Sequence, residues 1–111
     1  MPVKEQDKPL DLEQNLGIAA FVSKSLSDEN RLRILLSLCK GRKTVSSVVE
    51  ELDLSQPLVS HHLKELRRCL LVNVERKGLF VHYEIADPRI IDIVRQLAHL
   101  ATDLLSNRDT F

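Results

Sequence analysis

Apolar residues recur at helical spacing through the middle of the chain, in two stripes that a short polar break separates. The first stripe consists of Val45, Val48, Val49 and Leu52, and the second of Val59, Leu63, Leu66 and Leu70. Steps of three and four residues place the members of each stripe on one side of a helix. The pattern therefore predicts two helices joined by a tight turn, which is the arrangement of a helix-turn-helix.

The second of these helices, about residues 55–69, has a polar outer side. Ser55 can accept hydrogen bonds from the free N–H groups of the first turn, and Pro57 falls where a missing N–H costs little. The outer side carries amide, hydroxyl, imidazole and cationic groups at Gln56, Ser60, His61, Lys64 and Arg68. Such groups suit base edges and phosphates better than a core. We therefore predict that this is a recognition helix for the DNA major groove.

Two more helices are expected earlier, over about residues 11–25 and 29–40. Asp28 or Ser27 can cap the start of the second, and Gly41 follows its end, where glycine often terminates a helix. The side that we expect this second helix to bury is formed by Leu32, Leu35, Leu36 and Cys39.

After residue 70 the period changes from helical to alternating. Apolar and polar residues alternate over 72–75 and 79–85, and Arg76-Lys77-Gly78 separates the two runs. This predicts a β-hairpin over about residues 71–86 with a basic tip. A hairpin directly after a helix-turn-helix is the wing of a winged helix, and its tip is expected to reach the DNA backbone or minor groove.

The last helix is expected over about residues 88–106, with Asp87 as its cap and Pro88 at its first position. Its apolar stripe is formed by Ile90, Ile91, Val94, Leu97, Ala98, Ala101, Leu104 and Leu105. This stripe is too wide for one small core, and the amphipathic helix at 11–25 also needs a partner surface. We therefore expect a homodimer whose interface combines the first and last helices.

The net charge of zero hides an uneven distribution. Residues 31–78 hold ten lysines and arginines against five aspartates and glutamates, whereas residues 1–30 and 79–111 carry net charges of −3 and −2. A basic centre that contains the helix-turn-helix is the footprint expected of a small DNA-binding domain. Further cations that we predict to contact phosphate are Arg42, Lys43, Arg67, Arg76 and Lys77.

Composition argues against several other classes of protein. No apolar run approaches the ~18 residues of a membrane span, and the N-terminus lacks the apolar block of a signal peptide. We therefore expect a cytoplasmic protein with no membrane partner. The histidines have no catalytic partners at a motif spacing, and three glycines are too few for a phosphate-binding loop, so we predict no enzyme.

Together these elements predict one mainly α domain of the α+β type at residues 11–106, with about five helices, a two-stranded wing and a flexible tail at 1–10. The order of elements and the segments LSDENRLRILLSL, LSQPLVSHHLKELRR and GLFVHYEI closely resemble the ArsR/SmtB family of bacterial winged-helix repressors. The resemblance covers about residues 15–105. It implies a homodimer on an inverted-repeat operator, released when an effector binds.

Positions that match the family's DNA contacts fall on the predicted recognition helix. By this resemblance the DNA-contacting residues are Ser55, Gln56, Ser60 and His61, with Lys64, Arg67 and Arg68 near the DNA backbone. Gln56 has the geometry to pair with an adenine edge. His62 is a further candidate, but the helical wheel turns it toward the edge of the core, which favours a structural role.

One departure from the family lies at the end of this helix. The family usually has a glycine before the Leu-Val that starts the hairpin, where this chain has Cys69-Leu70. Leucine disfavours the left-handed conformation of a glycine cap, so we expect the helix to end differently and the wing angle to change.

The effector ligands of the family's well-known branches are absent. Thr44-Val45-Ser46 replaces the two thiols of the arsenic type. Of the zinc-type ligands, Asp87 and Asp103 match, but Arg89 and Leu100 occupy the other two positions and cannot coordinate the metal. We therefore expect an effector that differs from these, or no effector, and the chain is otherwise expected to need no cofactor.

Two effector alternatives stay open. Asp92, His99 and Asp103 share one face of the last helix, where they can meet their symmetry mates around a divalent metal. Cys39 and Cys69 can serve as a redox pair if their Cα atoms approach within ~7 Å.

The prediction is thus a sequence-specific DNA-binding transcriptional regulator, and specifically a repressor. The alternative is a winged-helix protein-interaction module without specific DNA binding, for which an apolar outer face would be more usual.

Overall fold

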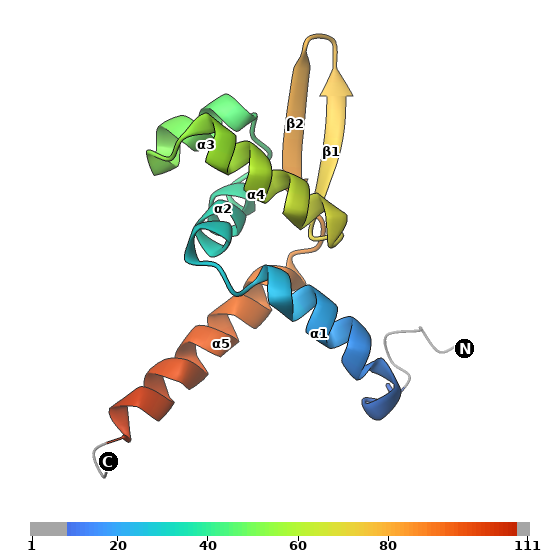
Figure 1. Ribbon diagram of the computed structural model, residues 1–111, viewed down its shortest axis with the longest axis vertical. Coiled ribbons are helices and arrows are strands. Elements are labelled where there is room, and N and C mark those ends of the chain that lie inside the picture. Colours follow the sequence, from blue (N-terminus) through green and yellow to red (C-terminus); the bar gives the residue numbers. More distant parts are fainter. Residues whose placement is uncertain (1–8, 109–111) are drawn as a thin grey trace.

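The computed structural model describes residues 9–108 of the chain (Figure 1). A short 3₁₀ helix precedes five α-helices, and an antiparallel hairpin lies between the fourth and the fifth. The elements are η2 (Glu13–Asn15), α1 (Leu16–Ser25), α2 (Glu29–Cys39), α3 (Val45–Leu52), α4 (Gln56–Arg68), β1 (Val72–Lys77), β2 (Phe80–Ile85) and α5 (Arg89–Ser106). The predicted winged helix-turn-helix is confirmed. The predicted tail at 1–10 lies outside the described residues, except for residues 9 and 10.

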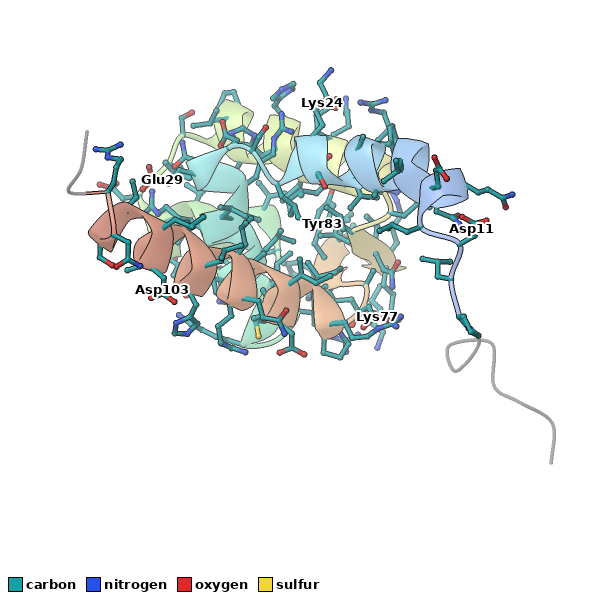
Figure 2. All side chains as sticks on the ribbon, turned by 90° about the horizontal axis from the view of Figure 1, so that it is seen from below. Asp11, Lys24, Glu29, Lys77, Tyr83 and Asp103 are labelled. Atoms are coloured by element: carbon teal, nitrogen blue, oxygen red, sulfur yellow. The ribbon has the colours of Figure 1, made fainter. Side chains whose placement is uncertain are left out.

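Helices α2, α3 and α4 pack around one core, with the base of the hairpin and the start of α5 against it. The fully buried side chains are Ile34, Leu35, Leu38, Val48, Val59, Leu63 and Leu66. Figure 1 shows α1 and α5 projecting from this body on the side opposite the hairpin tip. Figure 2 views that side, and α1 and α5 both lie across it. The body is therefore closed around its core, while the outer helices extend away from it.

Polar caps fix where the central helices begin. The side chains of Asp28, Thr44 and Ser55 each accept a hydrogen bond from the backbone N–H three residues further on. These bonds satisfy donors that the helix itself leaves unpaired. Helix α5 begins at Arg89, one residue later than predicted, and Asp87 Oδ1 accepts from its N–H at 2.9 Å.

Helix α2 buries a different side from the predicted one. Ile34, Leu35 and Leu38 are at most 1% exposed, whereas Leu36 is 49% exposed and Cys39 is also exposed. The prediction that Leu36 and Cys39 face the core is therefore wrong. The run from 34 to 39 is almost continuously apolar, so spacing alone allows two neighbouring faces, and packing against α3 and α4 selects one of them.

Helix α4 ends in a left-handed turn without a glycine. Leu70 has a φ of 65° and is 81% exposed, so its predicted place in the buried stripe is wrong. The N–H of Leu71 donates to the Leu66 carbonyl at 2.9 Å, and the N–H of Leu70 donates three residues back at 3.0 Å. This is the Schellman pattern. The expectation of a different helix end is also wrong, because leucine here adopts the conformation that glycine adopts more easily.

The strands β1 and β2 pair along their whole length. Their turn consists of Gly78 and Leu79 alone, and the φ of 61° at Gly78 is a left-handed conformation that glycine adopts without strain. The predicted basic tip is wrong in detail, because Arg76 and Lys77 lie within β1. The residue at the tip is Leu79, which is 98% exposed.

Candidate nucleic-acid interface

Helix α4 separates buried from exposed side chains along its length. Val59, Leu63 and Leu66 have no exposed surface and hold the helix against the core. The exposed polar residues at this helix are Ser55, Gln56, Ser60, His61, Lys64, Arg67 and Arg68. Apart from Arg68, whose guanidinium carbon lies 5.8 Å from the centroid of the Phe21 ring on α1, they present donors and acceptors of the kinds that contact base edges and phosphates. The structure thus brings most of the predicted candidates on α4 to one accessible side.

His62 lies inside the body and not on that side. It is 5% exposed, its Nδ1 accepts a hydrogen bond from Arg31 Nε at 3.1 Å, and its Nε2 lies 3.7 Å from Asp28 Oδ1. This position removes His62 from the DNA-contact candidates, since its ring joins α4 to the start of α2. Burial lowers the pKa of His62, and although Asp28 opposes this shift, the neutral ring is the form that can accept from Arg31.

The predicted phosphate-contacting cations fall into a free and an ion-paired group. Within residues 9–108, Lys64, Arg67 and Arg76 have no ion-pair partner. The ion pairs of the others are Arg42–Glu75 (2.7 Å), Lys77–Glu75 (3.6 Å), Lys43–Glu51 (2.9 Å) and Arg68–Glu65 (3.1 Å). Exposed pairs of this kind contribute only about 0–1 kcal/mol, so most can open toward a phosphate.

Lys43 is held more firmly than the other paired cations. Its side chain is 19% exposed, and Nζ donates to Ser37 Oγ and to Glu51 Oε2, both at 2.9 Å. Ser37 also donates to Glu51, and Lys40 approaches that carboxylate at 3.0 Å. These donors, the Ser37 hydroxyl first, lower the pKa of Glu51 to about 2. The contacts make Lys43 a link between α2 and α3 and remove it from the available phosphate contacts.

Two contacts attach the wing to the segment before α3. Lys43 and Tyr83 exchange backbone hydrogen bonds of 2.9 and 2.8 Å, and Arg42 reaches Glu75 on β1. Tyr83 in turn packs against the core, and Figure 2 labels it within the body. The wing is therefore held beside the helix-turn-helix, with the free cation Arg76 on the strand that leads to its tip.

Some residues that position this surface carry no signal in the sequence. Arg31 contacts His62, which is 31 positions away, and Ser37 contacts Glu51 at a separation of 14. Neither separation follows from the periodicity of one helix, so only the packed fold brings these partners together.

The candidate metal ligands do not assemble into a site within one chain. Asp92 pairs with Arg95 at 3.1 Å, while His99 and Asp103 lie about one turn apart on the exposed surface of α5. Within residues 9–108 no group of three His, Cys, Asp or Glu side chains could hold a metal ion.

The two cysteines have different surroundings, and both are free. Cys39 is exposed at the end of α2. Cys69 is 3% exposed after α4, and its sulfur accepts a hydrogen bond from the buried hydroxyl of Ser25 at 2.6 Å.

Comparison with known proteins decides the family. The model of the arsR family of bacterial regulatory proteins matches residues 28–74. A probable mercury resistance operon repressor of Streptomyces lividans is 38% identical over 72% of this chain, which spans 64% of that relative's length. A transcriptional repressor SmtB homolog of Synechocystis is 32% identical over 84% of this chain and 70% of the relative. This chain belongs to the ArsR family.

A solved structure agrees with this fold. The homodimeric winged helix-turn-helix DNA-binding domain from Mycobacterium bovis matches 93% of this chain and 96% of that chain, with a TM-score of 0.72 at 24% identity. Membership of the ArsR family makes this chain a winged helix-turn-helix transcriptional regulator and not an enzyme. In the described part of the chain, no helix combines the length and apolarity that crossing a membrane requires.

Proposed function

We propose that this ArsR-family chain represses transcription in the cytoplasm by binding an inverted-repeat operator as a homodimer. Helix α4 enters the major groove, and the wing lies against the adjacent backbone or minor groove. The observation that carries the proposal is the division of α4, whose apolar side is fully buried while its polar side is open. The two relatives described above are named as repressors, which supports the direction of the effect.

Within this proposal, base edges and phosphates are contacted by different side chains. Gln56, Ser60 and His61 lie toward the start of α4 and read bases. Phosphates are contacted by Lys64, Arg67 and Arg76, which have no ion-pair partner among residues 9–108, and these contacts fix the register of the helix on the duplex. None of these contacts requires a metal or another cofactor.

The dimer follows from apolar side chains that one chain leaves open. Apart from Phe21, whose ring faces Arg68 of the same chain, the exposed large apolar residues on α1 and α5 are Leu16, Ile18, Ile93, Leu97, Leu100, Leu104 and Leu105, each between 51% and 67% exposed. A surface of this size on a small soluble domain marks a site of association. A two-fold dimer through α1 and α5 covers it and presents two copies of α4 to two half-sites.

The test is selection of bound duplexes from a random DNA pool, followed by salt titration of the selected operator. We expect an inverted repeat and a steep fall of affinity with salt. Replacing Lys64 with Ala should reduce the salt slope by about one unit, because one phosphate contact is lost. Lys43→Ala is the matched control, since Lys43 is already paired with Glu51, and it should leave the slope unchanged once folding is verified.

Base readout needs a separate variant. Replacing Gln56 and His61 together should relax discrimination at individual operator positions by about 1–3 kcal/mol each. A double variant that binds operator and random DNA as the parent does would remove α4 from the interface and favour a protein-interaction module. Transcription from an operator-containing promoter should fall when the protein is added, and a rise would instead indicate an activator.

A further inference from the structure

A second feature of the molecule lies away from the DNA-facing side, in a cavity between α1, α2 and α4. Its volume is about 310 Å³, which is at the lower end of the range for small-molecule sites. Phe21, Lys24 and Ser25 line it from α1, Arg31 from α2, and Glu65, Arg68 and Cys69 from the end of α4. Three cations and one carboxylate give this lining an excess of positive charge.

Two of the three cations have hydrogen-bond donors that their contacts in the described chain do not use. Lys24 has no ion-pair partner within residues 9–108. Arg31 uses only its Nε to reach His62, so the contact with the buried ring fixes the guanidinium while its two terminal nitrogens are not used in that bond. A fixed guanidinium edge binds a carboxylate through two parallel hydrogen bonds. Arg68, in contrast, is already neutralised by Glu65.

The other walls are apolar or weakly polar. The Phe21 ring forms an apolar wall of the cavity, and the guanidinium carbon of Arg68 lies 5.8 Å from the centroid of this ring. The Ser25 hydroxyl donates to the Cys69 sulfur and is therefore engaged. One thiol and one carboxylate among three cations are unsuited to a metal ion, which needs several anionic or neutral ligands. The cavity thus offers an anion site beside an apolar wall.

We propose that this cavity binds a small organic monocarboxylate with an apolar body. The carboxylate lies between Lys24 and the terminal nitrogens of Arg31, and the apolar body lies against Phe21. The ligand would touch the outer helix α1 and the recognition helix α4 at once. A ligand that binds more tightly to one relative position of α1 and α4 increases the population of that arrangement. If the arrangement also changes how α4 fits the operator, ligand binding is coupled to operator affinity. This coupling, unlike the site itself, rests on the proposed function.

Alkylation of Cys69 reports on occupancy in the full chain without DNA. The rate of modification by iodoacetamide is followed at Cys69 and at the exposed Cys39 by peptide mass, with benzoate, phenylacetate or hexanoate added. At least one carboxylate should slow the reaction of Cys69 saturably, by about fivefold or more at saturation, and leave Cys39 unchanged. The matching neutral amides should protect little.

Matched lysine variants place the effect in the cavity. Lys24→Gln should weaken protection by about threefold or more, because a charge-assisted hydrogen bond is lost. Lys64→Gln removes the same charge from the outer side of α4, away from the cavity, and should leave the protection of Cys69 in this DNA-free assay unchanged. A further comparison uses the unliganded protein and the ratio of the alkylation rate with anionic iodoacetate to the rate with neutral iodoacetamide. This ratio should be higher at Cys69 than at Cys39, because the cavity is positively charged, and Lys24→Gln should lower it at Cys69.

Several results would overturn the site: no protection by any of the three carboxylates, equal protection by the amides, or identical behaviour of the two lysine variants. A Cys69 that reacts only after denaturation would show a closed cavity and also contradict the proposal. Operator affinity is measured separately with the protecting carboxylate. Protection of Cys69 with unchanged operator affinity removes the coupling but leaves the site, whereas failure to bind any selected DNA contradicts the proposed function alone.

Discussion

The central body and the two outer helices place their apolar residues in opposite ways. In α2, α3 and α4 the core side chains are less than 2% exposed, whereas the large apolar residues on α1 and α5 are mostly more than half exposed. One chain therefore buries the core of its own helix-turn-helix but leaves the apolar surface of α1 and α5 exposed. Substitutions in the body should therefore change the free energy of unfolding at any protein concentration. Substitutions on the outer helices should instead change the dissociation constant of the proposed dimer.

The largest effect is expected from a cavity in the body. Replacing Leu63, which has no exposed surface, with Ala should lower the free energy of unfolding by about 2–5 kcal/mol. The matched control is Leu79→Ala at the wing tip, where the side chain is 98% exposed and the change should stay within about 0.5 kcal/mol. Urea titration at several protein concentrations measures both. Equal effects of the two substitutions would contradict the closed core.

The outer helices are tested by charges on the open stripe of α5. Leu97→Glu combined with Leu104→Glu should raise the dimer dissociation constant by at least about tenfold, roughly 1.4 kcal/mol, because the carboxylates would be buried without partners. Sedimentation equilibrium measures this constant. Leu79→Glu introduces the same change on the wing and should leave it unaltered, and a double variant that still dimerises like the parent would exclude α5 from the interface.

A smaller effect concerns the link between α2 and α3. The pKa of Glu51 is about 2 in the folded protein, compared with an ordinary value of 4.5 for the unfolded chain. As the pH falls, the unfolded chain therefore binds the proton first. The stabilisation is complete above about pH 4.5 and is lost between there and pH 2. Glu51→Gln should remove this part of the pH dependence and cost about 0.5–1 kcal/mol at pH 7.

The control for this link is the neighbouring carboxylate. Glu50 is exposed and has no ion pair within residues 9–108, so Glu50→Gln should leave the unfolding free energy and its acid dependence as they are. Acid titration of thermal stability for both variants makes the comparison. If the two variants lose stability in the same pH range as the parent, Glu51 does not link the helices.

The smallest effect, and the only gain, is expected where α4 meets the wing. Leu70→Gly should raise the unfolding free energy by about 0.5 kcal/mol, because relief of the left-handed strain exceeds the greater freedom of glycine in the unfolded chain. The same substitution at Leu36, exposed in the interior of α2, should instead cost about 1 kcal/mol. A loss at both positions would show that Leu70 is not strained.

The sequence predicted the order of elements because caps, hydrophobic period and turn residues act locally. Asp28 and Ser55 are caps in the structure for the reason that their residue types suggested. Prediction from local sequence failed where one spacing of apolar residues is compatible with more than one buried face. The apolar run of α2 allows two faces, and the choice between them, which exposes Cys39, depends on what packs against the helix.

The candidate site was predictable only in outline. A helical wheel identifies which side chains of α4 can face outward. It cannot show that Lys43 is paired with Glu51 while Lys64 has no ion-pair partner in the described part of the chain. The same holds for the cavity beside Cys69, since α1, α2 and α4 come together there only after folding. Ion pairs and cavities depend on contacts between distant segments, which spacing within one helix does not encode.

The most direct test of the account is the stoichiometry of the complex with the selected operator, measured by native mass spectrometry at saturation. We expect two chains on one duplex, with half-sites about one helical turn, roughly 10 base pairs, apart. In the Leu97→Glu, Leu104→Glu variant the two-chain complex should be lost or much weakened. One chain per duplex at saturation, or a selected sequence without two-fold symmetry, would contradict a symmetric dimer that reads DNA with two copies of α4.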